Sequence, residues 1–200
     1  MDGSFLFQPA RIGPNAILQL VPVLDHAIGV EERRRLFAEA GVTLPPPDAG
    51  MLPETEVIRL HRAVCLWLPD RAPDLLRQAG LATGDYILAN RIPRLAQRII
   101  RLMPAPLAAR VLAKAIARHS WTFAGSGAFG VEKFEPLTVS IRHNPLAVGA
   151  GNHASCHWHA AVFERLFCAL VWRSVQIKEM ACCAAGQEVC RFEISPKIRA

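Results

Sequence analysis

The chain has 200 residues, of which 52% are hydrophobic and 20% charged, and its formal net charge is +6 at pH 7. This length is sufficient for one well-buried core, and no apolar run approaches the 18 residues of a membrane-spanning helix. Charged residues are fewer than the roughly 25% usual in soluble domains, a surplus of apolar residues that a large apolar pocket or an oligomer interface would explain.

The first 50 residues are predicted to form a helical arm and a proline-rich linker. Residues 1–14 read as irregular, residues 15–27 and 31–40 as helices, and residues 43–50, with three consecutive prolines, as a linker that marks a boundary between segments 1–50 and 51–200. Residues 16–24 are apolar but contain Gln19 and Pro22 and follow no basic segment, so they do not fit a secretion signal. We therefore expect a cytoplasmic protein whose six cysteines are reduced and, where clustered, bind metal.

Further helices are predicted after residue 53. One runs to Leu68, before Pro69, and a short one covers residues 70–79, ended by Gly80 and followed by a turn at residues 83–86. His61 and Cys65 stand four residues apart, which is metal-ligand spacing, but no further ligand is near in sequence. We therefore interpret both as core residues of the helix.

No acidic residue occurs between Tyr86 and Glu132. Four arginines recur at intervals of three and four residues and are predicted to share one helical stripe, beside an apolar stripe of Ile92, Leu95, Ile99 and Leu102. These arginines are Arg91, Arg94, Arg98 and Arg101. The stripe is either a solvated face or a surface that attracts anions, namely substrate carboxylates, an acidic partner or membrane headgroups at a peripheral contact. We expect no nucleic acid, because aromatic residues do not interleave with the arginines.

The second half changes from helical to extended character. Residues 120–124, 129–134 and 137–142 are predicted strands, residues 160–172 a helix, and residues 176–182 and 188–194 a hairpin with a turn at Gly186. This order predicts an α+β fold with the N-terminal helices packed on an antiparallel sheet.

Residues 125–130 spell G-x-G-x-x-G, the pattern of a dinucleotide-binding loop. That loop functions because its third glycine opens a helix whose N-terminus holds the pyrophosphate. Here the following residues are β-rich and are interrupted by Pro136, and no acidic residue stands at the ribose position. We therefore expect no NAD(P) site, and interpret the glycines as a hairpin or a close backbone approach.

The stretch from Cys156 to Phe192 contains the strongest candidate site. Cys156, Cys182 and Cys190 are metal ligands by type, and a fourth donor would complete a closed tetrahedral zinc site. Two sets of donors are candidates for the fourth position: Glu179, and the histidines His153, His157 and His159 near Cys156. Such a metal would connect the start of a helix to the hairpin that follows it.

The pattern Glu179-x2-Cys182-x3-Gly186-x3-Cys190-x-Phe192, with Cys156 upstream, resembles the C-terminal signature of the 4-vinyl reductase domain. That domain occurs in aromatic-sensing bacterial regulators and in the bacteriochlorophyll 4-vinyl reductase family, which this chain resembles more. The resemblance favours Glu179 as the fourth ligand, a structural zinc and a homodimer.

The resemblance also implies a function in bacteriochlorophyll biosynthesis. Our first hypothesis is a protein that binds a hydrophobic Mg-tetrapyrrole and presents it to pathway enzymes; the alternatives are an enzyme that reduces a vinyl group to ethyl and a sensor of another small molecule. From residue type alone, aromatic walls, arginines that meet propionates and an axial histidine are expected around the ligand. The candidates are Trp121, Phe123, Phe129, Phe134, Trp158 and His143.

Overall fold

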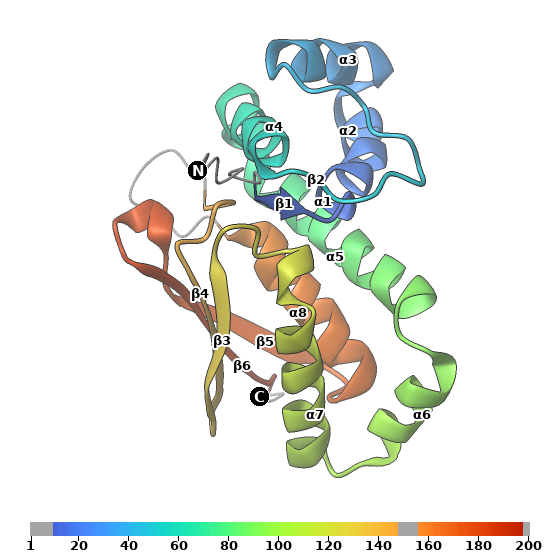
Figure 1. Ribbon diagram of the computed structural model, residues 1–200, viewed down its shortest axis with the longest axis vertical. Coiled ribbons are helices and arrows are strands. Elements are labelled where there is room, and N and C mark those ends of the chain that lie inside the picture. The colour runs from blue at the N-terminus through green and yellow to red at the C-terminus, as the bar shows by residue number, and fades with distance from the viewer. Residues whose placement is uncertain (1–9, 148–155, 198–200) are drawn as a thin grey trace, which may run out of the picture.

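The computed structural model describes residues 10–147 and 156–197, which form an α+β fold (Figure 1). The N-terminal elements are β1 (Arg11–Ile12), α1 (Asn15–Leu18), α2 (Leu20–Ile28), α3 (Val30–Glu39), β2 (Leu52–Pro53) and α4 (Glu54–Trp67). Next come α5 (Ala72–Asn90), α6 (Arg94–Leu102), α7 (Ala105–Arg118) and the 3-10 helix η1 (Ser120–Thr122). The remainder is β3 (Ala128–Phe134), β4 (Leu137–Arg142), α8 (His157–Leu170), β5 (Val175–Ala181), the 3-10 helix η2 (Cys183–Ala185) and β6 (Val189–Pro196).

The main sheet is antiparallel, with the strand order β3-β4-β6-β5. Val139 of β4 pairs with Phe192 of β6, and Ile141 pairs with Cys190. All four of these side chains are buried, whereas the alternating position Arg191 is only partly covered. This period of two shows that one face of the sheet carries the core and the other is more open.

Helices α8 and α7 pack on the sheet, whereas α1 to α4 form a layer beyond α5 (Figure 1). Helix α8 is central, because it contacts both α5 and β5 and buries Phe163 and Phe167. The α+β class was predicted correctly. The expected direct packing of the N-terminal helices on the sheet gives way to an arrangement in which α5 and α8 separate these layers.

Helix α5 passes through two glycines that were expected to end it. A Cβ atom at Gly80 would lie 2.3 Å from the Trp158 carbonyl oxygen, and one at Gly84 would lie 2.6 Å from the Arg165 Cβ. Both glycines therefore allow α5 and α8 to approach closely, and this packing outweighs the roughly 1 kcal/mol that glycine costs a helix interior. The prediction of a short helix over residues 70–79 and a turn at residues 83–86 was wrong.

Three further boundaries differ from those predicted. The first predicted helix divides at Gln19, because Pro22 has no N–H with which to continue the helical ladder from residue 18. The predicted strand at residues 120–124 is instead the 3-10 helix η1, in which the Thr122 hydroxyl donates to the His119 carbonyl oxygen at 2.8 Å. Arg91 lies at the C-cap of α5, so it does not belong to the α6 stripe.

The segment before residue 51 is integrated with the rest of the fold. Strand β1 pairs with β2 across the proline-rich linker, and α1 and α2 pack on α5. The proposed boundary between segments 1–50 and 51–200 stays a prediction. Within residues 10–147 and 156–197, no helix has both the length and the apolar character needed to cross a bilayer.

Candidate metal centre

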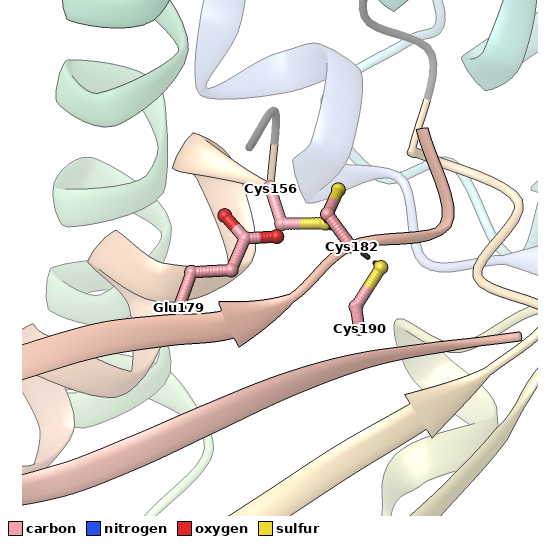
Figure 2. Close-up of side chains that lie close together, drawn as sticks. All are labelled: Cys156, Glu179, Cys182 and Cys190. Atoms are coloured by element: carbon pink, nitrogen blue, oxygen red, sulfur yellow. Dashed lines mark hydrogen bonds between the residues drawn. The ribbon is translucent and has the colours of Figure 1, made fainter. Parts of the chain in front are cut away.

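Four potential ligands from the C-terminal third of the chain converge between α8 and the β5–β6 hairpin (Figure 2). Cys156 is the N-cap of α8, Glu179 lies on β5, Cys182 follows that strand, and Cys190 lies on β6. One donor atom from each lies within 4.8 Å of the others, and the three cysteines are buried. The structure thus brings together all four residues that the sequence analysis selected.

A β-bulge explains how Glu179 and Cys182 reach the same face although three residues separate them. Glu179 pairs with Phe192, but Ala181 pairs with the next residue, Arg191, so Met180 is extra on β5. On a regular strand, residues three apart point to opposite faces. The additional residue reverses that alternation, which directs Cys182 inward and leaves Met180 51% exposed.

The distances between the sulfur atoms suit a tetrahedral metal. The Cys156 and Cys182 Sγ atoms are 3.7 Å apart, and those of Cys156 and Cys190 are 3.1 Å apart. Zinc–sulfur bonds of about 2.3 Å at tetrahedral angles require separations of about 3.8 Å, so small adjustments would seat the ion. Glu179 Oε1 is buried without a hydrogen-bond partner, as expected for an acceptor that faces a cation.

Asn144 supports the cluster and was not found from the sequence. Its buried amide nitrogen lies 3.3 Å from Cys156 Sγ and 3.5 Å from Cys190 Sγ, and its Oδ1 accepts the Leu146 N–H at 3.1 Å. The Cys183 N–H also donates to Cys190 Sγ at 3.3 Å. Donors aimed at sulfur stabilise thiolates and orient them. No sequence spacing distinguished Asn144, which follows β4 and precedes a proline.

The site favours a bound cation electrostatically. Burial, followed by hydrogen bonding to Cys182, raises the pKa of Glu179 to about 7, and hydrogen bonds to Cys182 and Cys190 raise the pKa of Cys156. Four acidic groups therefore resist simultaneous ionisation, whereas a dication would reverse that preference and displace their protons. A surface hollow lined in part by Glu179, Cys182 and Gln187 gives solvent access to the ligands.

The histidine alternatives are separated from this ligand group. His159 is buried, donates through Nε2 to the Phe123 carbonyl oxygen at 3.3 Å and accepts from Asn144 through Nδ1 at 3.4 Å. Burial lowers its pKa to about 4. His157 is partly buried, and His153 lies outside the described residues. His61 also behaves as a core residue, because its Nε2 donates to the Ala16 carbonyl oxygen at 2.9 Å.

The candidate pocket residues divide between several places. Phe123 and Phe129 form an edge-to-face pair with ring centroids 5.4 Å apart, and both contact Phe163 of α8. Buried Trp158 packs edge-on against His159. Trp121 on η1 is 58% exposed, and His143 is exposed at the end of β4.

Phe134 and the arginines lie away from this aromatic pair. Five residues of strand separate Phe134 from Phe129, roughly 16 Å, and Phe134 instead lies beneath the Arg110 guanidinium at 5.3 Å. Arg101 donates to the carbonyl oxygen of Ala169 near the C-terminus of α8, roughly 20 Å along that helix from Cys156. Arg91 covers the Tyr86 ring at 5.8 Å. The structure therefore does not gather the predicted arginines and aromatic residues into one site.

Comparisons with known proteins agree with the signature around the metal centre. The family model of the 4-vinyl reductase domain matches residues 137–196. The bacteriochlorophyll synthase 23 kDa chain of Cereibacter sphaeroides is 61% identical over 190 residues, covering 94% of this chain and 92% of that protein. The protein of the same name from Rhodobacter capsulatus is 54% identical, covering 94% of this chain and 88% of that protein.

Two solved structures share the fold at low sequence identity. A variant H-NOX protein from K. algicida, in its Fe(II) unliganded state, aligns with a TM-score of 0.64 at 14% identity, covering 94% of this chain and 97% of that chain. An H-NOX protein from S. oneidensis, in its Fe(II)NO ligation state, aligns with a TM-score of 0.56 at 10% identity, covering 94% of this chain and all of that chain. These likenesses concern the fold alone.

Proposed function

Because the chain belongs to the family of the bacteriochlorophyll synthase 23 kDa chains, we propose that it binds a hydrophobic Mg-tetrapyrrole intermediate of bacteriochlorophyll biosynthesis and presents it to pathway enzymes. The observation that carries this proposal is the 61% identity over nearly the whole length of both proteins. The name of the relatives supports a place among proteins of that synthesis. We further propose a structural zinc and a cytoplasmic location.

The pigment is proposed to bind where η1, the start of β3 and the end of β4 meet. Phe123 and Phe129 are half-buried there and supply apolar faces, and Trp121 on η1 extends the aromatic surface. His143, exposed at the end of β4, is the candidate axial ligand for magnesium. Phe134 is left out of this site, since roughly 16 Å of strand separates it from Phe129.

The zinc is proposed to hold this end of the molecule together. Cys156, Glu179, Cys182 and Cys190 would occupy its four positions, which leaves none for substrate. Bound to these residues, zinc supplies a structural crosslink between α8 and the hairpin. Asn144 follows β4, next to His143, and its amide reaches two of the thiols, so the metal centre also supports the end of β4.

Titration with a magnesium porphyrin tests the binding proposal. Zinc-loaded protein should shift the porphyrin absorption band in a saturable manner, and metal-free porphyrin should bind more weakly if His143 ligates magnesium. Phe129→Ala should weaken binding about tenfold or more, because a lost ring contact removes roughly 1–3 kcal/mol of apolar burial. Phe134→Ala is the matched control and should leave the affinity unchanged.

Two results would contradict the proposal. An unchanged porphyrin spectrum at all protein concentrations would exclude pigment binding by the isolated chain. Conversion of a divinyl substrate to its ethyl product by purified protein with a nicotinamide cofactor would establish the enzymatic alternative instead.

A further inference from the structure

Helix α6 has three distinct faces and lies at a corner of the molecule between α5 and α7 (Figure 1). At 100° per residue, Ile100 points towards the core, where it is buried. Arg94, Arg98 and Arg101 share a second face. The third face carries three large apolar side chains, Leu95, Ile99 and Leu102.

That third face is exposed to solvent. Leu95 is 69% exposed, Ile99 48% and Leu102 86%, and Leu107 at the start of α7 is 49% exposed. Single exposed apolar residues are ordinary, but here four occur within 13 residues and three follow one helical stripe. The sequence pattern identified this stripe, and the structure shows that the protein's own core does not cover it.

The charge beside this apolar face is uniformly positive. No acidic residue occurs between Tyr86 and Glu132. Arg101 is held by the Ala169 carbonyl oxygen and so fixes α6 against α8. Arg94 and Arg98 are exposed, and no ion pair is found for them within residues 10–147 and 156–197.

We propose that α6 and the start of α7 dock this protein on the surface of an anionic lipid bilayer. The apolar residues Leu95, Ile99, Leu102 and Leu107 would enter the boundary between headgroups and acyl chains, while Arg94 and Arg98 contact lipid phosphates. An exposed apolar stripe beside a basic stripe is the pattern of helices that lie in the membrane interface. The proposal is independent of the pigment-binding function.

A second copy of the chain fits this face less well. A two-fold interface brings the same patch of each copy together, so Arg94 and Arg98 would meet their own counterparts with no acidic residue of this stretch to pair with them. Stable dimers also bury about 800 Å² on each partner, more than the exposed side chains of a nine-residue helix provide. A planar anionic surface satisfies both the charge and the shape.

Flotation of the zinc-loaded full chain with vesicles tests this docking surface. Vesicles of phosphatidylcholine with 30% phosphatidylglycerol should bind the protein at least about tenfold more strongly than phosphatidylcholine alone, and added salt should weaken the binding. Leu95→Ser with Leu102→Ser should reduce binding to both compositions at least about tenfold. Arg94→Glu with Arg98→Glu should abolish the preference for phosphatidylglycerol.

Matched controls separate these effects from overall charge and hydrophobicity. Leu66→Ser removes a leucine of α4 that is 60% exposed, and Arg62→Glu with Lys178→Glu makes the same change in net charge at exposed sites outside α6 and α7. Both should bind vesicles like the wild type. Zinc content and far-ultraviolet circular dichroism establish that each variant is folded.

A second measurement does not depend on loss of binding. The fluorescence of a Leu102→Trp variant should be quenched by brominated lipids in the vesicles far more than that of Leu66→Trp. Equal quenching of the two, or unchanged flotation of the Leu95 and Leu102 variant, would overturn the proposal. A dimer that this double variant dissociates, measured by sedimentation velocity without vesicles, would assign the face to a second copy instead.

Discussion

Replacement of Gly80 by alanine tests how the packing of α5 on α8 determines the metal centre. The new Cβ would lie 2.3 Å from the Trp158 carbonyl oxygen and 2.7 Å from the Ala161 Cβ. Since carbon–carbon contacts are optimal at about 3.5–4.0 Å, the helices must separate locally by roughly 1 Å. Both obstructing groups belong to the backbone or first side-chain atom of α8, so rotation of a flexible side chain cannot relieve the contact.

Two opposing contributions determine the expected change in stability. Alanine favours the helix over glycine by about 1 kcal/mol. Overpacking in a core usually costs about 1–3 kcal/mol, and the upper end applies here because two rigid groups are involved. We therefore expect Gly80→Ala to lower the free energy of unfolding by about 1–2 kcal/mol, measured by urea denaturation of the zinc-loaded protein.

The same substitution should weaken zinc binding. Trp158 lies two residues after Cys156, so displacement of the first turn of α8 moves a ligand by more than the roughly 0.2 Å that metal geometry tolerates. We expect the zinc affinity, measured by competition with a chromophoric chelator, to fall at least about tenfold. Gly50→Ala is the control, since its Cβ meets nothing within 4 Å. A Gly80→Ala protein as stable as the wild type, with unchanged zinc affinity, would refute this reasoning.

Three further predictions concern the ligands and their support. Cys182→Ser should bind far less zinc by elemental analysis and lower the thermal midpoint, and full zinc content would contradict a Cys3Glu site. Asn144→Ala should reduce zinc affinity about 10–100-fold, because two thiolates lose a hydrogen-bond donor, and chelator competition checks this. With zinc chelated, Glu179 has a folded pKa of about 7, above its ordinary value of 4.5, so this group's contribution favours the folded state at low pH and declines as pH rises from about 4.5 to 7. Glu179→Gln should remove that decline relative to the chelated wild type in urea denaturation at pH 5.5 and 8, and identical pH profiles would contradict the assignment.

The sequence predicted the C-terminal half well because its signals are local. Val175–Ala181 and Val189–Pro196 alternate in character and are separated by Gly186, which adopts the left-handed conformation at φ +79°. The apolar period of α8 and the cysteines at its start and on the hairpin were equally legible. These features placed the four candidate ligands before any tertiary contact was known.

The errors arose where tertiary packing decided the structure. Gly80 reads as a helix terminator in sequence, but the close approach of α8 makes glycine necessary within α5. Asn144 acquires its role only when the end of β4 lies beside Cys156 and Cys190. No periodicity or spacing along the chain encodes either contact.

The bulge at Met180 has a consequence for how this motif is recognised in other proteins. Two ligands three residues apart on a strand can share a face only if an additional residue interrupts the pairing, so the E-x2-C spacing itself predicts the irregular register. A relative that lost one residue between these positions would turn its cysteine towards solvent. In alignments of this family, we therefore expect a one-residue deletion at this point to coincide with loss of the cysteine that follows it.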